Sequence, residues 1–134
     1  MASITRKIIV SPNVNKPVAP YSQGILVDNV LYISGQLGTN LSVELAEGIE
    51  NQTRQALQNV GHILNAAGAT FNNVVKVTVL CADLSTFEIM NRVYREFFTD
   101  KLPARAAFQV ARLPLDALVE IEAVAVVGDI TESE

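Results

Sequence analysis

The sequence of 134 residues contains one cysteine, Cys81, and one histidine, His62. A single cysteine excludes an internal disulfide and a multi-cysteine metal site, and it suits a reducing compartment. Cys81 lies inside an apolar run, which is typical of a buried small side chain, and no neighbour in the sequence would stabilise its thiolate. His62 has no second ligand or triad partner, so we interpret it as a surface or boundary residue. We therefore expect neither a metal nor a cofactor.

Long apolar runs and basic clusters are also missing. No apolar run reaches the roughly 18–20 residues that span a bilayer, so we expect no membrane partner. The net charge is −4, and the ten Lys and Arg residues are scattered, which disfavours nucleic acid as the main ligand. Residues 1–10 lack the apolar region of a secretory signal. We expect a cytoplasmic protein, with mitochondrial targeting as the alternative, because this segment has basic residues and no acid.

Apolar residues, in contrast, are abundant. They make up 49% of the chain, and the mean hydropathy is +0.27, which is high for one small domain. The length predicts a single domain over residues 1–134, with a flexible tail over about 129–134. The apolar excess is best accommodated in a subunit interface, so we expect a homo-oligomer.

The hydrophobic periodicity predicts an α+β domain in the order β-β-β-α-β-α-β-β. Asp28 and Asn29 indicate a hairpin turn, Gly68 ends the first helix, and Ser85 with Glu88 predicts a capping box for the second. The predicted strands cover 7–10, 24–27, 30–34, 74–82, 104–110 and 118–127, and the helices cover 49–67 and the segment after Ser85.

Both faces of the expected six-stranded mixed sheet are partly apolar. In the last strand Val119 and Ile121 point to one face, whereas Glu120, Glu122 and Val124 point to the other. We expect the two helices to cover one face and a partner subunit to cover the other.

Arg105 is the strongest candidate for chemistry, because it lies near the start of an otherwise apolar strand, where an unpaired charge is costly. One interpretation is an ion pair with Glu120 or Glu122 across neighbouring strands. The other is an Arg that awaits a ligand carboxylate, which the planar guanidinium grips with two parallel hydrogen bonds.

Glu120 and Tyr21 also have two interpretations each. Glu120 is either a carboxylate at the end of a strand or at an interface, or a group that orients water and exchanges protons. Tyr21 either packs down the proline-rich loop that contains it or contributes to a pocket.

Five sequence blocks together resemble the RidA/YjgF family of reactive imine deaminases, and they are similar to its animal branch. They occur in the family's order and span nearly the whole chain. They are residues 20–24, 32–36, 103–114 and 119–125, together with the spacing of Asn91, Tyr94 and Phe97.

The resemblance implies a chorismate mutase-like fold, a homotrimer and active sites in clefts between subunits. It implies a 2-iminobutanoate/2-iminopropanoate deaminase that hydrolyses imines and enamines of the 2-aminoacrylate type to 2-oxo acids and ammonia, without a cofactor. Arg105 would hold the substrate carboxylate, and Glu120 would manage water and protons. The implied substrate-binding positions are Tyr21, Ser34, Gly35, Phe87, Asn91, Arg105, Ala106 and Ala107.

Two departures from the family pattern qualify the resemblance. Many bacterial members have Cys where this chain has Ala107, so a thiol is not required here. Residues 39–48 form a shorter stretch than in some relatives, which would alter the rim of the cleft. Two alternatives stay open: an endoribonuclease or translation inhibitor, and a non-catalytic ligand-binding or chaperone-like trimer.

Overall fold

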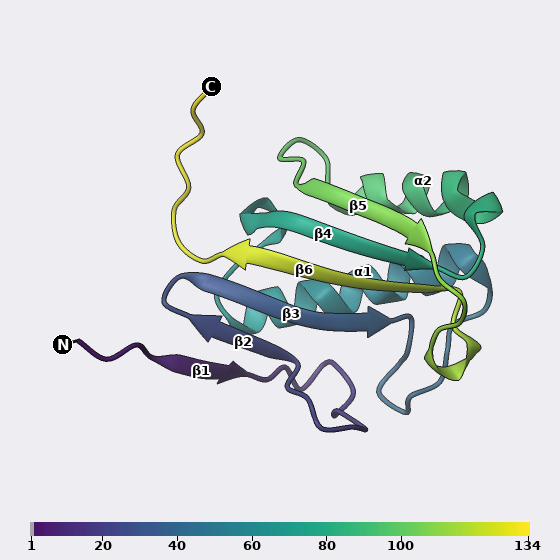
Figure 1. Ribbon diagram of the computed structural model, residues 1–134, viewed down its shortest axis with the longest axis horizontal. Coiled ribbons are helices and arrows are strands. Elements are labelled where there is room, and N and C mark those ends of the chain that lie inside the picture. Colours follow the sequence, from purple (N-terminus) through teal and green to yellow (C-terminus); the bar gives the residue numbers. More distant parts are fainter. Residues whose placement is uncertain (1) are drawn as a thin grey trace.

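The computed structural model describes residues 2–134, so that Met1, the first residue of the predicted domain, lies outside the described residues. Six strands form one sheet in the order β1-β2-β3-β6-β4-β5, in which only β4 and β5 are parallel. Figure 1 shows both helices on one side of this sheet. The elements are β1 (Arg6–Ile9), β2 (Gly24–Val27), β3 (Val30–Leu37), α1 (Gly48–Ala66), β4 (Val74–Cys81), α2 (Phe87–Phe97), β5 (Ala104–Gln109) and β6 (Val119–Val126).

The core lies between the sheet and the helices. In α1 the side chains of Leu57, Val60 and Leu64 are fully buried, and they recur at the spacing of three and four that places residues on one helix face. In β6 every second residue from Val119 to Ala125 is buried, as the twofold period of a strand requires. The predicted order of elements and the helix-covered face are confirmed.

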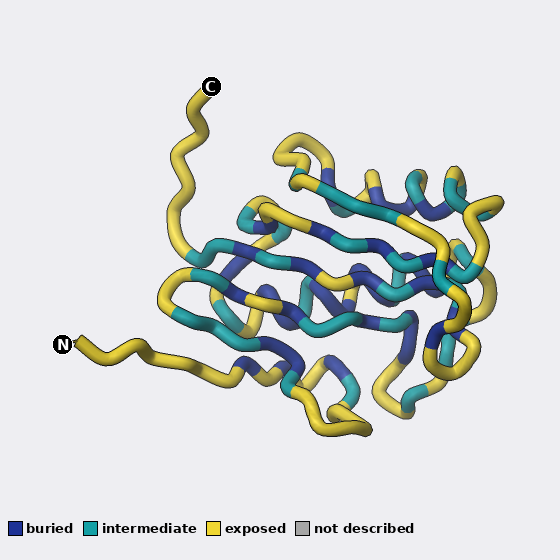
Figure 2. The backbone as a smooth tube through the Cα atoms, in the orientation of Figure 1, coloured by how far each residue is buried: buried dark blue, intermediate teal, exposed yellow. Residues whose placement is uncertain are grey.

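The opposite face of the sheet, called the open face below, has large apolar side chains in contact with solvent. Ile8, Tyr32 and Phe108 are 55%, 53% and 47% exposed, although they lie on three different strands of the sheet. Figure 2 shows mixed exposure along the strands and an alternation of buried and exposed stretches along the helices behind them. An apolar surface of this kind is typical of a subunit interface.

The start of the second helix differs from the prediction. Ser85 and Glu88 do not form a capping box; instead the Asp83 carboxylate accepts a hydrogen bond from the Ser85 backbone N–H at 2.9 Å. A short 3-10 turn over Leu84–Thr86 intervenes, and α2 begins at Phe87. Asp83 lies two residues before Ser85, and its carboxylate caps the 3-10 turn by accepting the hydrogen bond of the Ser85 backbone N–H, which is therefore not available to Glu88.

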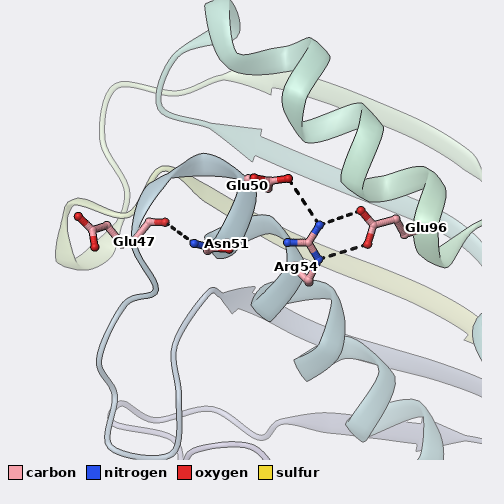
Figure 3. A network of polar contacts seen from close by, with 5 residues as sticks. All are labelled: Glu47, Glu50, Asn51, Arg54 and Glu96. Carbon is pink, nitrogen blue, oxygen red and sulfur yellow. Dashed lines mark hydrogen bonds and ion pairs between the residues drawn. The ribbon is translucent and has the colours of Figure 1, made fainter.

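The two helices are tied together at their surface (Figure 3). The guanidinium of Arg54 in α1 donates to both carboxylate oxygens of Glu96 in α2, at 3.2 and 2.8 Å, and lies 3.7 Å from Glu50. The side-chain amide of Asn51 donates to the Glu47 carbonyl at 3.0 Å. Because these groups are solvent-exposed, water screens the ion pair and it contributes little to stability. Within residues 2–134, neither helix is long and apolar enough to cross a membrane.

Candidate functional site

Arg105 lies on the edge strand β5, with its side chain on the helix side of the sheet. This orientation follows from the register, because Arg105 pairs with the fully buried Val77 of the parallel strand β4. Three residues of α2 surround the guanidinium: Asn91 accepts a hydrogen bond from Nη1 at 2.8 Å, and the rings of Tyr94 and Phe87 lie 4.7 and 5.4 Å from the guanidinium carbon. We call these four residues the arginine cluster.

The arginine cluster holds a positive charge without neutralising it. Asn91 is an uncharged acceptor, and in residues 2–134 Arg105 makes no ion pair. The aromatic faces attract the cation and leave most of its N–H donors free. Arg105 also borders a cavity of about 240 Å³ with Asn91, Tyr94, Leu102 and Pro103. The guanidinium can therefore bind a planar carboxylate by donating hydrogen bonds to its oxygens.

This arrangement rules out the ion pair between Arg105 and Glu120 or Glu122, one of the two interpretations drawn from the sequence. Glu120 pairs with Leu80 and Leu37 in the sheet register, on the open face. Arg105 lies on the other face, so the carboxylates of β6 and the guanidinium of β5 point away from each other.

A second group of predicted residues gathers on the open face. Tyr21, Ser34, Gly35 and Glu120 line one cavity of about 370 Å³, and we call them the glutamate cluster. The Ser34 hydroxyl donates to the Ser22 carbonyl, and the Ser34 backbone N–H donates to the Gln23 carbonyl at 2.9 Å. These bonds join β3 to the proline-rich loop that carries Tyr21.

Gly35 leaves the space that the Glu120 carboxyl occupies. A Cβ atom at position 35 would lie 2.9 Å from the Glu120 Cδ and 3.0 Å from Oε2. The β3–β6 register shifts between Ile33 and Gln36, and this irregularity brings Gly35 to the carboxyl. A glycine at this close approach lets the Glu120 carboxyl keep its position, which an added Cβ would displace.

Burial raises the pKa of the Glu120 carboxyl above its usual range, and the nearby negative charge of Glu122 raises it further. Both causes penalise the ionised form. The carboxyl can therefore take up and release a proton closer to neutral pH than an ordinary glutamate, as a general acid or base requires.

The structure brings seven of the predicted residues into these two clusters, but Ala106 and Ala107 border neither cavity. They follow Arg105 on β5, where Ala107 points to the helix side and Ala106 to the open face. Among the strands of residues 2–134, β5 pairs with β4 alone, so the outer edge of β5 presents its backbone groups to solvent or to a partner.

The two clusters do not meet within one chain. The cavity beside Arg105 and the cavity beside Glu120 share no lining residue, and the two side chains lie on opposite faces of the sheet. One described chain therefore carries two halves of the predicted site.

Several supporting residues were missed by the sequence interpretation. The Gln23 side-chain amide is buried. Its oxygen accepts a hydrogen bond from the Ser11 backbone N–H at 2.7 Å, and its nitrogen donates to the Ser11 carbonyl at 3.3 Å. The nitrogen also donates to the carbonyls of Val14 and Asn15. From α1, Asn59 donates to the carbonyls of Leu37 and Thr39. Polar residues within apolar stretches were the available signal, because buried amides need partners.

Tyr94 was noted only as part of the helix spacing, yet it contacts Arg105. Its hydroxyl is buried and makes no hydrogen bond within residues 2–134. Burial raises the pKa of Tyr94, and the Arg105 charge opposes that shift. Burial likewise raises the pKa of the Cys81 thiol, which disfavours a reactive thiolate at this position.

Comparisons with known proteins give one consistent family. Residues 12–127 match the family model described as Endoribonuclease L-PSP. The 2-iminobutanoate/2-iminopropanoate deaminase of Bos taurus is 50% identical, over 98% of this chain and 97% of that protein.

Two solved structures extend the similarity to the fold. RidA from an Antarctic Psychrobacter is 41% identical, with a TM-score of 0.88 over 90% of this chain and 99% of that one. E. coli TdcF with bound serine is 36% identical, with a TM-score of 0.87 over 91% and 99% of the two chains.

Proposed function

Because the chain belongs to the RidA/YjgF family, we propose that it is a 2-iminobutanoate/2-iminopropanoate deaminase, which hydrolyses the C=N bond of 2-imino acids. Supporting this, mammalian relatives at 46–50% identity carry that name. The carrying observation is the unneutralised Arg105 guanidinium, held by Asn91 and two aromatic rings. A solved relative binds serine, which also has an α-carboxylate.

The complete site in this proposal forms between two subunits of a homotrimer. The apolar open face supports such an assembly, because Ile8, Tyr32 and Phe108 would otherwise stay in water. The arginine cluster of one subunit would then face the glutamate cluster of the next. This pairing explains why each chain carries the two halves on opposite faces of its sheet.

In the proposed reaction, Arg105 binds the substrate carboxylate with its free N–H donors and so places the imine carbon. Backbone groups of Ser34, Gly35, Ala106 and Ala107 line the bound substrate. Water adds to the carbon of the N-protonated imine, and Glu120 takes a proton from this water, which gives the neutral carbinolamine. Glu120 then returns the proton to the amino nitrogen, ammonia leaves, and the hydroxyl loses its proton as the C=O bond of the 2-oxo acid forms. The raised pKa of Glu120 suits both proton transfers.

The reaction needs no covalent nucleophile, since an iminium carbon is already electrophilic. Ala107 supplies no thiol, and Cys81 is buried. The implied partners are small imine and enamine carboxylates and further copies of the chain.

The direct test is imine hydrolysis with an amino-acid oxidase that generates 2-iminobutanoate in situ and semicarbazide that traps the remaining imine. Wild type should reduce the trapped imine, Arg105→Ala should not, and Arg105→Lys should recover part of the activity, because it keeps the charge and loses the planar fork. Arg92→Ala, at an exposed position of α2, is the matched control. Wild-type protein that leaves the trapped imine at the buffer level would refute the deaminase.

Subunit mixing tests the composite site. Arg105→Ala and Glu120→Gln trimers, each inactive alone, should regain activity after partial unfolding and joint refolding, because some interfaces then combine an intact arginine cluster with an intact glutamate cluster. If the mixture of folded trimers stays inactive, both residues act within one subunit.

The family model's description favours one second candidate, an endoribonuclease. The net charge of −4 opposes strong RNA binding. RNA cleavage that falls steeply with added salt, and that survives Arg105→Ala, would support this alternative over the deaminase.

A further inference from the structure

The cavity beside Glu120 has an apolar wall that the proposed reaction does not use. The wall consists of Val14, Val18, Val43, Pro114 and Leu115. The volume of about 370 Å³ would hold roughly a dozen water molecules, about twice the number of non-hydrogen atoms in 2-iminopropanoate. The smallest imine would leave much of this cavity unfilled.

Leu115 reaches the wall from an unusual backbone conformation. Leu115 and Asp116 have φ angles of +59° and +55°, and the Ala117 N–H donates to the Pro114 carbonyl at 3.0 Å. This is the pattern of a type I′ turn, whose central positions favour Asn and Gly. A leucine is strained there, because its Cβ crowds the backbone.

The surroundings hold this turn in place. The Arg112 guanidinium binds both carboxylate oxygens of Asp116, at 2.6 and 3.2 Å, and the Leu118 N–H donates to the buried Gln52 side chain at 2.9 Å. Strain of this kind persists where neighbouring contacts enforce it, and it concentrates at ligand sites. The side chain of Leu115 is 57% exposed, so packing into the core of the chain does not explain it.

We propose that Leu115 determines substrate specificity, because the apolar wall binds the side chain of imines derived from large aliphatic amino acids. This inference rests on the proposed imine hydrolysis at Glu120. With the reacting carbon near Glu120, the substrate side chain extends towards Leu115 and Val18, which border the same cavity. Each methylene that the wall removes from water should raise kcat/KM about fourfold.

The test compares the imines that an oxidase forms from L-2-aminobutyrate and from L-leucine, in wild type, Leu115→Ala and Leu115→Gly. Wild type should prefer the leucine-derived imine. Both variants should lower the leucine-to-aminobutyrate ratio of kcat/KM about fivefold or more, mainly through KM, and should keep turnover of the smaller imine. Glycine accepts the positive φ and alanine does not, so an equal loss in both variants assigns the effect to the side chain.

Leu84→Ala is the matched control, since Leu84 is 46% exposed and lies before α2, outside the wall. An unchanged ratio in both Leu115 variants would overturn the inference, as would a loss in Leu115→Ala that is absent in Leu115→Gly. Dissociation of the assembly by both variants in size-exclusion chromatography would assign Leu115 to an interface instead. Wild-type protein that hydrolyses neither imine would refute the deaminase itself, which separates the two failures.

Discussion

The arginine cluster and the glutamate cluster are built in different ways. Arg105 is held by residues of one helix, α2, whose side chains at positions 87, 91 and 94 share one face. The glutamate cluster combines two strands and a proline-rich loop, and a turn with two positive φ angles lines the same cavity. A regular element, α2, positions the first cluster, whereas buried hydrogen bonds position the irregular backbone beside the second.

The comparison assigns different work to the two clusters. A charge held by a neutral acceptor is ready for a ligand of opposite charge. A half-buried carboxyl with a raised pKa is ready to exchange protons. In the proposed function, substrate placement therefore depends on residues of a helix, proton transfer depends on Glu120 of the strand β6, and side-chain selection depends on a turn, as is common where a scaffold presents variable segments.

Among substitutions of residues that support the two clusters, the largest expected effect comes from giving Arg105 a permanent ion-pair partner. Asn91→Asp should form an ion pair with Arg105 and compete with the substrate carboxylate, so that kcat/KM falls about 100-fold, which corresponds to about 2.7 kcal/mol. Thermal stability should stay equal or rise. Steady-state kinetics with a melting curve checks this, and Asn91→Ala is the control, because it removes the bond without adding charge. An unchanged KM in the folded Asp variant would show that Arg105 does not bind the carboxylate.

Gln23→Ala tests whether the hydrogen bonds of Gln23 stabilise the proline-rich loop beside the glutamate cluster. The substitution leaves the buried Ser11 N–H and three carbonyls without this partner, and it should cost about 1–3 kcal/mol in the free energy of unfolding. Urea denaturation measures this loss. The exposed Gln58→Ala is the matched control, and equal stability of the two variants would contradict the role of Gln23.

Gly35→Ala should displace the Glu120 carboxyl, since the added Cβ would lie 2.9 Å from its Cδ. We expect kcat to fall about tenfold, with little change in overall stability, because the carboxyl can move towards solvent. Gly48→Ala is the control: its φ is +80° and its Cβ would meet no atom within 4 Å, so it should lose stability and keep kcat. A Gly35→Ala variant with wild-type kcat would show that the carboxyl position is not critical.

The smallest effect is a pH dependence of stability. The folded-state pKa of Glu120 is raised, so the folded chain binds more protons than the unfolded chain from the ordinary glutamate range upwards. The contribution of Glu120 to stability is therefore fully present at low pH and is lost as pH rises through the folded-state pKa. Glu120→Gln should flatten this part of the profile and be the more stable protein near neutral pH. Parallel profiles of the two proteins in thermal unfolding from pH 4 to 8 would contradict the shift.

The sequence predicted the elements better than their ends. β3 was expected over 30–34 but extends through Leu37, because an irregularity in the register lets pairing with β6 resume after Gly35. The capping box at Ser85 was wrong, because Asp83 competes for the same backbone group. The alternative side-chain partners of a backbone N–H at a helix start differ little in free energy, so neighbouring residues determine which hydrogen bond forms.

For the site, the residues that came from the family resemblance fell into two clusters, but the sequence left the partner of Arg105 open. The alternation along β6 correctly separated Glu120 from Val119. This alternation could not predict that Arg105 points to the other face of the sheet, because the orientation of Arg105 depends on the parallel register between β4 and β5. Gln23 and Leu115 escaped notice for a similar reason: their importance lies in contacts across long separations in the chain.

By itself, the sequence determined the order of strands and helices along the chain, the covering of one sheet face by the helices, and the apolar excess on the other face. These features follow from periodicity and composition, which act along the chain. Only the tertiary structure decided that Arg105 meets the neutral Asn91 and that Glu120 lies on the opposite face beside Gly35. Strand register and helix docking set those contacts, and both depend on packing energies summed over the whole sheet.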